Sequence, residues 1–149
     1  EFRRVLFRSV HGDLDEGLQD FGDQSVDYVL LTNTLQVLHR PLPLMREMAR
    51  VGRQCIITLP NFAHWSARVQ LALGGRMPKT PRLPYEWYDT PNIHLATLKD
   101  MRDLFRVANL RLLREIPLRT AADGQACAVR LWPNLLADAA IFVVEADRG

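Results

Sequence analysis

Cysteine is scarce in this sequence, and the placement of its two copies excludes several kinds of site. Cys55 and Cys127 are too few for a disulfide framework, and neither lies in a Cys-x-x-Cys pair. The four histidines, at positions 11, 39, 64 and 94, show no zinc-ligand spacing. We therefore expect no metal site, a structural role for Cys55 in the core, and a reducing compartment, the cytoplasm.

Long hydrophobic runs and the common catalytic motifs are absent as well. No apolar run approaches the roughly 18 residues of a membrane helix, and no small-residue cleavage site follows the basic N-terminus. There is no Gly-x-Ser-x-Gly elbow and no phosphate-binding glycine loop, because Gly74-Gly75 alone is too short. We expect no membrane span, no nucleophilic serine on a Gly-x-Ser-x-Gly elbow and no phosphate site on a glycine loop.

The chain also has no net charge when residues 1–9 are left out. The chain has a net charge of +2, and residues 1–9 (EFRRVLFRS) carry three arginines and one glutamate, so the remainder has 2 − 2 = 0. These nine residues look like a translated sequencing adapter, although residues 4–10 are apolar enough to form a strand. We expect residues 1–9 to be an artefact and residues 10–149 to be a partial domain. No basic stripe remains, so no nucleic-acid partner is expected.

What the sequence contains is a strand–helix–strand pattern from Val26 to Asn61. Residues 26–31 and 54–59 are near-continuous apolar runs, which predicts two strands buried on both faces. Residues 41–51 place apolar side chains on one helical face, with prolines at the start and Gly52 at the end. The spacing predicts a parallel βαβ unit in an α/β fold. Ligands of such sheets bind beyond the carboxyl ends of the strands, which here are followed by Thr32, Asn33 and Asn61.

Beyond Asn61, helix and strand patterns alternate around one long loop. Residues 63–73 predict a helix that Gly74-Gly75 ends, and residues 76–92 hold four prolines and three aromatic residues, typical of a rigid functional loop. Thr97 and Asp100 form a capping box that opens a helix to about Val107. Residues 110–118 and 140–144 predict strands, so the sheet is expected to end in a hairpin-like pair.

The polar and aromatic residues after these strands supply the candidates for chemistry. His64 and His94 are candidate general bases because histidine titrates near neutral pH, although an unsupported histidine is more often a loop or packing residue. Trp65 is expected to pack in the core from the apolar face of its helix. Tyr85 and Trp87 are candidate binding anchors on a rigid loop.

Three segments resemble the middle motifs of class I methyltransferases, which bind S-adenosylmethionine: Asp13-Leu-Asp15, Ser25-Val-Asp27-Tyr-Val and Leu35-Gln-Val-Leu-His39. Taken alone, Asp13 is either a carboxylate that accepts a hydrogen bond from an adenine amino group or a solvated turn residue. Five proline-aromatic blocks, in order, resemble the MetW family of methionine biosynthesis proteins more closely: Leu59-Pro-Asn-Phe-Ala-His-Trp65, Gly75-Arg-Met-Pro78, Leu83-Pro-Tyr-Glu-Trp-Tyr88, Thr90-Pro-Asn-Ile-His94 and Leu131-Trp-Pro-Asn-Leu135.

The MetW resemblance implies an incomplete Rossmann-like class I methyltransferase sheet with flanking helices. By analogy with the family, Asp13 and Leu14 lie near adenine, and Thr32 and Asn33 lie near the methionine end of S-adenosylmethionine. The family's first strand and its glycine-rich turn would precede residue 10, beside the strand at residues 26–31. We therefore expect an exposed apolar strand edge, and weak or no binding of the cofactor by this chain.

The resemblance leaves two functions open. In the first, the protein is a partner that supports a homoserine O-acyltransferase, MetX. The candidate partner or substrate surface consists of Asn61, Trp65, Arg76, Tyr85, Trp87 and Asn92. In the second, it is an S-adenosylmethionine-dependent methyltransferase acting on an unknown small molecule, with His64 or His94 as the base. No acid–base pair stands out at a strand end, which favours the partner.

Overall fold

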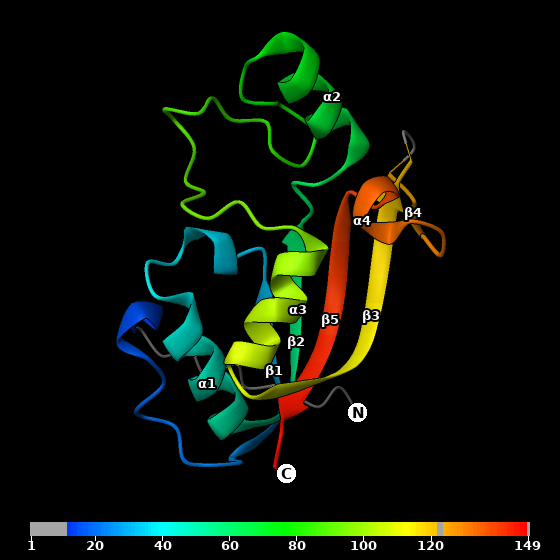
Figure 1. Cartoon of the computed structure of the whole chain (residues 1–149). Helices are drawn as coiled ribbons and strands as arrows, with labels where there is room; N and C mark the ends of the chain where they lie inside the picture. The colour runs from blue at the N-terminus through cyan, green and yellow to red at the C-terminus, as the bar shows by residue number, and fades with distance from the viewer. Residues whose placement is uncertain (1–11, 122–123, 149) are drawn as a thin grey trace, which may run out of the picture.

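A computed structural model describes residues 12–121 and 124–148, which are organised around one five-stranded sheet (Figure 1). The strands are β1 (Val26–Thr32), β2 (Gly52–Pro60), β3 (Leu110–Thr120), β4 (Ala126–Ala128) and β5 (Ala139–Ala146). Their order in the sheet is β1-β2-β5-β3-β4, with β1 parallel to β2 and the other pairs antiparallel. This arrangement confirms the expected α/β sheet that ends in antiparallel strands.

In the described part of the chain, four helices and two short 3-10 turns connect the strands. They are η1 (Leu14–Glu16), η2 (Leu35–Val37), α1 (Pro41–Val51), α2 (Trp65–Gly74), α3 (Leu98–Val107) and α4 (Pro133–Leu136). The strand considered for residues 4–10 lies outside the described part of the chain.

Helix α1 is the predicted crossover between the parallel strands. It begins at Pro41, and its buried side chains include Leu44 and Met48, which face the sheet. Gln24 closes its carboxyl end, because the Gln24 Nε2 donates to the carbonyl oxygens of Arg50 and Gly52, both at 3.2 Å. The βαβ unit is therefore confirmed.

Helix α3 starts at the predicted capping box. The Asp100 N–H donates to Thr97 Oγ1 at 3.3 Å, and the Thr97 N–H donates to Asp100 Oδ2 at 2.9 Å. The helix buries Met101 and Phe105, and the Phe105 ring lies 5.2 Å from that of Phe142 on β5. Helices α1 and α3 cover the same face of the sheet, so the core lies between them and the strands (Figure 1).

The opposite face of the sheet is open along β1. Tyr28 is 58% exposed and Leu30 is 64% exposed. The next residue, Leu31, has its side chain on the other face of the strand and is buried in the core. The prediction that this strand is buried on both faces was wrong, because β1 is an edge strand and the described helices pack on one face only. In the sheet formed by the described residues, β1 is the apolar edge strand that the family resemblance implies.

Helix α2 projects from the carboxyl end of β2, away from the sheet (Figure 1). It ends as predicted, at Gly75 in the left-handed conformation (φ 60°). Only Ala67 of its side chains is buried, so the expectation that Trp65 packs in the core was wrong. Among the described residues, no helix has the length and apolar character needed to cross a membrane.

Candidate functional site

The polypeptide turns sharply at the carboxyl end of β1. Asn33 has a positive φ of 50°, a conformation that is uncommon for residues other than glycine. Its N–H donates to the Thr58 carbonyl oxygen at 3.0 Å, which ties the turn to β2. Thr32, the last residue of β1, and Asn33 are both exposed at the carboxyl end of the parallel strands, where ligands of α/β sheets bind.

A cavity of about 380 Å³ lies at this end of the sheet. The turn after β1 supplies Asn33 and Gln36, and the loop before α3 supplies Tyr85 and Asn92. Its other lining residues are mostly prolines, which are Pro60, Pro81, Pro84 and Pro91. We refer to it as the carboxamide cavity, after the side chains of Asn33, Gln36 and Asn92.

Gln36 joins the two halves of the carboxamide cavity. It is only 9% exposed, and its Nε2 donates to the Asn33 carbonyl oxygen at 2.9 Å. Its backbone oxygen accepts from the N–H groups of Ile93 at 2.8 Å and His94 at 3.0 Å. Its Oε1 is buried and accepts no hydrogen bond from any described residue.

A second cavity of about 720 Å³ adjoins the first and contains His64. His64 Nδ1 lies 2.8 Å from Ser66 Oγ and accepts from the Ser66 N–H at 3.4 Å, so the imidazole caps α2 and its proton lies on Nε2. Burial lowers the pKa of His64; nearby Asp138 opposes this shift and Arg119 adds to it. The ring is therefore neutral at pH 7. Its unprotonated nitrogen, Nδ1, already accepts the hydrogen bond that caps α2.

Arg82 forms the wall shared by the two cavities. Its guanidinium donates to Thr120 Oγ1, and its Nε lies 3.5 Å from Asp138 Oδ1. The Asp138 carboxylate also accepts from the Thr120 N–H at 2.7 Å. These contacts hold the loop before α3 against the end of β3. They leave further guanidinium N–H groups available, since arginine has five donors.

The other predicted polar candidates lie apart from the carboxamide cavity. Asn61 is buried, and its Nδ2 donates to the carbonyl oxygens of Asn134 at 3.2 Å and Ala137 at 2.8 Å. We therefore assign Asn61 to the frame that holds β2 to the start of β5, and not to a contact surface. His94 is exposed and lines neither of the two cavities.

The two residues predicted to lie near adenine have structural roles in this chain. Asp13 Oδ1 accepts from the Asp15 N–H at 2.9 Å and caps η1, while Leu14 packs against the core. Neither lines any of the cavities described here.

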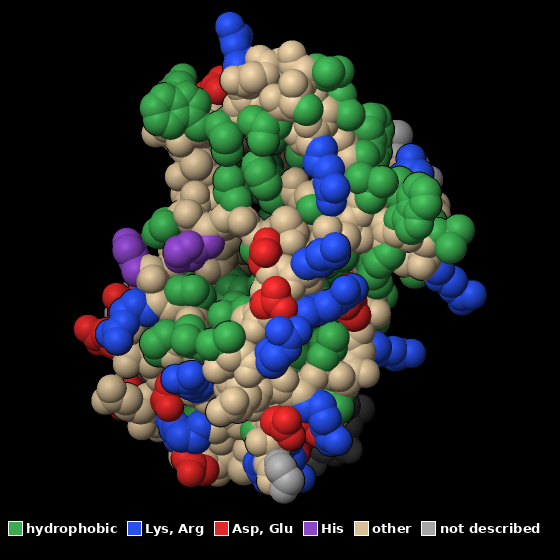
Figure 2. Space-filling view, in the orientation of Figure 1, with side chains coloured by type: hydrophobic (Ala, Val, Ile, Leu, Met, Phe, Trp, Pro, Cys, Tyr) green, Lys and Arg blue, Asp and Glu red, His purple; other side chains and the backbone are tan. Residues whose placement is uncertain are grey.

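Exposed aromatic side chains gather on the part of the molecule that projects from the sheet. We call α2 and residues 75–95 the aromatic lobe, and Figure 2 shows hydrophobic side chains collected over it. Trp87 is 71% exposed and Tyr88 is 72% exposed, and Trp65 and Tyr85 are about half exposed. Arg76 is exposed on the same lobe. Of the predicted surface residues, the structure brings Trp65, Arg76, Tyr85 and Trp87 to this lobe.

Sequence reasoning missed Gln36 and Arg82 as cavity residues, and it named Trp132 only within one proline-aromatic block. The position of Gln36, just beyond a strand end, was the available signal, whereas nothing local marked Arg82. Trp132 is exposed and has a positive φ of 46°, which is strained for an aromatic residue. Its place before Pro133 could have indicated this turn.

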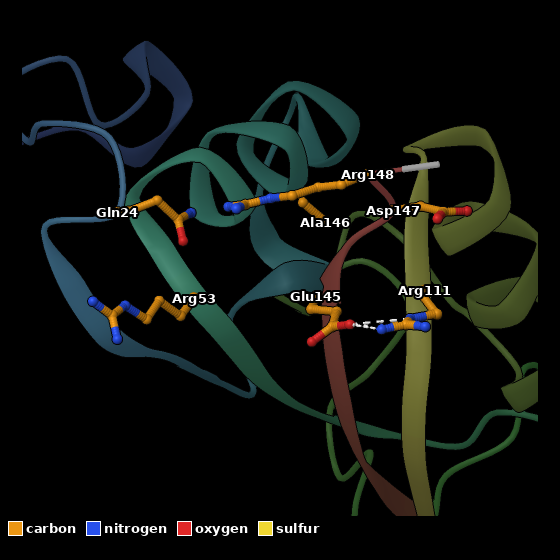
Figure 3. Close-up of a pocket in the computed structure, with 7 residues that line it drawn as sticks. All are labelled: Gln24, Arg53, Arg111, Glu145, Ala146, Asp147 and Arg148. Carbon is orange, nitrogen blue, oxygen red and sulfur yellow. Dashed lines mark hydrogen bonds and ion pairs between the residues drawn. The ribbon is translucent and has the colours of Figure 1, made fainter.

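A cavity of about 790 Å³ lies at the other end of the sheet, away from all of these residues (Figure 3). It is open and lined by charged side chains, among which Arg111 pairs with Glu145. Arg53 at its rim pairs with Asp27 at 3.5 Å. The charged side chains at this end form a solvated surface, so we assign no function to this cavity.

Known proteins match this chain in sequence and in fold. It is 39% identical over 131 residues, 87% of its length, to the bifunctional methionine biosynthesis protein MetXA/MetW of Rhodopirellula baltica, and spans 21% of that protein. A possible histamine N-methyltransferase of Thermotoga maritima shares the fold (TM-score 0.59, 12% identity, 84% of this chain and 57% of that one). So does an S-adenosylmethionine-dependent methyltransferase of Archaeoglobus fulgidus (TM-score 0.62, 11% identity, 96% and 69%). The family model for methionine biosynthesis protein MetW matches residues 4–144, and the chain belongs to the MetW family.

Proposed function

We propose that this protein acts in methionine biosynthesis as the partner of a homoserine O-acyltransferase, MetX, which it contacts through the aromatic lobe. The observation that carries this proposal is the exposure of Trp87 and Tyr88, 71% and 72%, on a loop that projects from the sheet. Aromatic residues dominate the binding energy of protein interfaces. Large exposed apolar patches on soluble proteins mark interaction sites.

The loop is braced, which suits it to binding. Gln70 on α2 donates to the Lys79 carbonyl oxygen at 3.0 Å and accepts from the Lys79 N–H at 3.1 Å. Thr80 and Leu83 exchange two further backbone hydrogen bonds, at 3.1 and 2.9 Å. A loop that is ordered before binding loses less conformational entropy on association. The aromatic lobe is therefore a preorganised surface.

The choice of partner rests on the relative from Rhodopirellula baltica. Its name joins MetXA and MetW in one polypeptide, and this chain spans 21% of it. Covalent joining raises the effective concentration of two domains that associate. We infer that the separate MetW chain associates with MetX, in the cytoplasm.

Alanine substitutions in the lobe test the docking proposal. Replacing Tyr85 and Trp87 together should weaken binding to the acyltransferase at least about 30-fold, since even one interface anchor contributes about 2 kcal/mol or more. Tyr28→Ala is the matched control, because Tyr28 is an exposed aromatic residue on the open face of the sheet. Affinity is measured by biolayer interferometry with the acyltransferase immobilised. If the double variant binds as tightly as the unmodified chain, the lobe is not the docking surface.

We further propose that the intact family protein binds S-adenosylmethionine, with Thr32 and Asn33 near its methionine end, and that this chain binds it weakly or not at all. Asp13 Oδ1 is engaged as a helix cap and Leu14 packs on the core, which reduces what these two residues offer to adenine. Titration calorimetry tests this, and micromolar affinity would contradict it.

Methyl transfer is the second candidate function, and the fold shared with S-adenosylmethionine-dependent methyltransferases favours it. His64 and His94 are its proposed bases. His64 supports this role poorly, because its Nδ1 is bound to Ser66. Transfer of a radiolabelled methyl group to a homoserine-pathway metabolite by the full-length protein would establish this function.

A further inference from the structure

We propose that the outward side of α2 docks into an apolar groove with an acidic rim on the homoserine O-acyltransferase. This inference rests on the proposed function, and it adds the helix face that makes the contact and the chemistry of the partner surface. Helix α2 (Trp65–Gly74) lies at the end of the aromatic lobe that is away from the sheet (Figure 1).

The side of α2 that faces solvent is apolar. Within this helix, all of which the structure describes, Ala67 is the one buried residue and so marks the inner side. The opposite side carries apolar residues at positions i, i+4, i+7 and i+8, which we call the outer stripe: Trp65, Val69, Ala72 and Leu73. Val69 is 44% exposed and Leu73 is 86% exposed. A surface helix normally turns its polar side outward, so the outer stripe indicates a partner.

The chain itself supports α2 mainly at its two ends. His64 Nδ1 accepts from the Ser66 N–H at 3.4 Å, and the Gly75 N–H donates to the Leu71 carbonyl oxygen at 3.0 Å. The helix has ten residues, and isolated helices shorter than about 12–15 residues are marginal, because most helical stability comes from packing of an apolar face. Packing of the outer stripe against a partner supplies the contact that this helix lacks among the described residues.

The segment around the outer stripe is positively charged. Residues 62–85 contain no aspartate or glutamate, and their basic residues are Arg68, Arg76, Lys79 and Arg82. Lys79 pairs with Glu86, and Arg82 pairs with Asp138. Two arginines are therefore left to attract acidic groups of a partner.

These two arginines lie along the helix and just beyond its end. Arg68, on α2, donates from its Nε to the Ala63 carbonyl oxygen at 2.7 Å and from its Nη2 to that of Asn134 at 3.4 Å, so it is held by neutral groups. Arg76 is exposed and lines a cleft of about 710 Å³ together with Trp87. Arginine binds carboxylates with two parallel hydrogen bonds. An acidic side chain at the rim of the partner groove matches this cleft.

The observations favour the acyltransferase over a second copy or a membrane. Two copies that packed stripe against stripe would bring like charges together at Arg68 and Arg76, which opposes pairing. Membrane-surface helices carry a strongly charged polar face, whereas Ser66, Gln70 and Leu71 on the sides of α2 are uncharged. The MetXA/MetW relative, by contrast, joins the two proteins in one polypeptide.

Binding of the full chain to immobilised acyltransferase tests the outer stripe. The double variant Val69→Gln, Leu73→Gln should bind at least about tenfold more weakly, because it removes two apolar side chains from the contact. The matched control is Val107→Gln, Leu113→Gln, which makes the same changes at exposed positions outside the lobe and should bind as the unmodified chain does. Glutamine has a higher helix propensity than valine, and both stripe positions are exposed, so the variant retains its fold.

Arg76→Glu tests the acidic rim. Its association rate should fall at least about threefold at about 20 mM salt, and the difference should shrink at about 500 mM salt, because salt screens the attraction between the charged surfaces. Arg148→Glu makes the same change at the other end of the sheet (Figure 3) and should leave the rate unchanged. Equal rates for these two variants would overturn the acidic rim.

Unchanged affinity in the Val69→Gln, Leu73→Gln variant would overturn the role of α2. If replacement of Tyr85 and Trp87 still weakens binding, the docking of the lobe stands and only this inference fails. No binding of the unmodified chain to the acyltransferase would overturn both proposals together.

The same variants identify any other occupant of the outer stripe. Vesicles of equal parts phosphatidylcholine and phosphatidylglycerol are tested by sedimentation, and dimers by light scattering after size exclusion. Vesicle binding or dimer formation that is lost in the stripe variant, while its affinity for the acyltransferase is unchanged, would assign the stripe to a membrane or to a second copy. Either result would overturn the inference.

Discussion

Two aspartates that lie two positions apart have different roles before β1. Asp13 caps the short η1 turn, whereas Asp15 binds across the fold. Asp15 Oδ1 accepts from the Arg40 N–H at 2.9 Å, and its Oδ2 accepts from the His39 N–H at 3.3 Å. The Arg40 hydrogen bond, with those of His39, holds the pKa of the Asp15 carboxyl below its ordinary value. Asp15 therefore anchors the start of α1 to the N-terminal segment.

We expect Asp15→Asn to lower the free energy of unfolding at pH 7. Because the folded-state pKa lies below the unfolded one, the stabilisation is present above about pH 4 and is lost as the pH falls through the folded value. The difference between the two proteins should therefore shrink in acid. Urea unfolding at pH 7 and near pH 3 measures it, with Asp20→Asn at an exposed position as the control. A difference that stays constant over this range would contradict the assignment.

At the scale of single residues, the sequence indicated where the site lies but not how its side chains are paired. Thr32 and Asn33 follow from the end of an apolar run, because a strand end can be read from local pattern. The pairing of Gln36 depends on residues 91–94, which lie far along the chain and are brought close only by the sheet. The state of its Oε1 therefore could not be predicted. The roles of the predicted site residues in binding remain predictions.

At the scale of elements, the contact between α1 and the parallel strands depends on Gly52. A Cβ at this position would lie 2.6 Å from Cγ2 of Val29 and 3.3 Å from the Met48 carbonyl oxygen. The valine is stiff at χ1, and the carbonyl belongs to the last turn of α1, so neither yields easily. Gly52 thus sets the close approach of helix and strand.

Gly52→Ala should lower the free energy of unfolding by about 1–3 kcal/mol, the usual cost of overpacking a buried site. Thermal and urea unfolding measure the loss. Val29→Ala removes the contacted methyl group, so the double variant should lose less stability than the sum of the two single variants. Simple additivity of the two losses would show that the clash with Val29 is not the cause.

Elements with strong local signals could be predicted, whereas their surroundings could not. Helices α1 and α3 follow from prolines, a capping box and an apolar face of regular period. The same reasoning located α2 but misplaced Trp65, because periodicity does not reveal whether another element covers a face. Likewise, the apolar run of β1 gave the strand but not its edge position, since burial depends on neighbours elsewhere in the chain.

At the scale of the whole molecule, we expect the open face of β1 to promote self-association. Val26, Tyr28 and Leu30 are exposed on a strand that lies at the edge of the described sheet and contains neither proline nor lysine. Leu30→Lys should raise the concentration at which the protein aggregates, because charged residues on edge strands oppose pairing. Light scattering against concentration measures this, with Leu131→Lys as the control at an exposed site off the strand. Equal aggregation of the two variants would exclude β1 as the cause.

We propose that the acyltransferase docks on the aromatic lobe and not on another surface of this chain. Hydrogen–deuterium exchange of this chain, alone and with the acyltransferase, locates the contact most directly. Docking through the aromatic lobe predicts slower exchange in residues 65–95 and unchanged exchange in residues 26–32 when the complex forms. Protection of residues 26–32 with no change in residues 65–95 would contradict it, and would assign docking to the edge of the sheet.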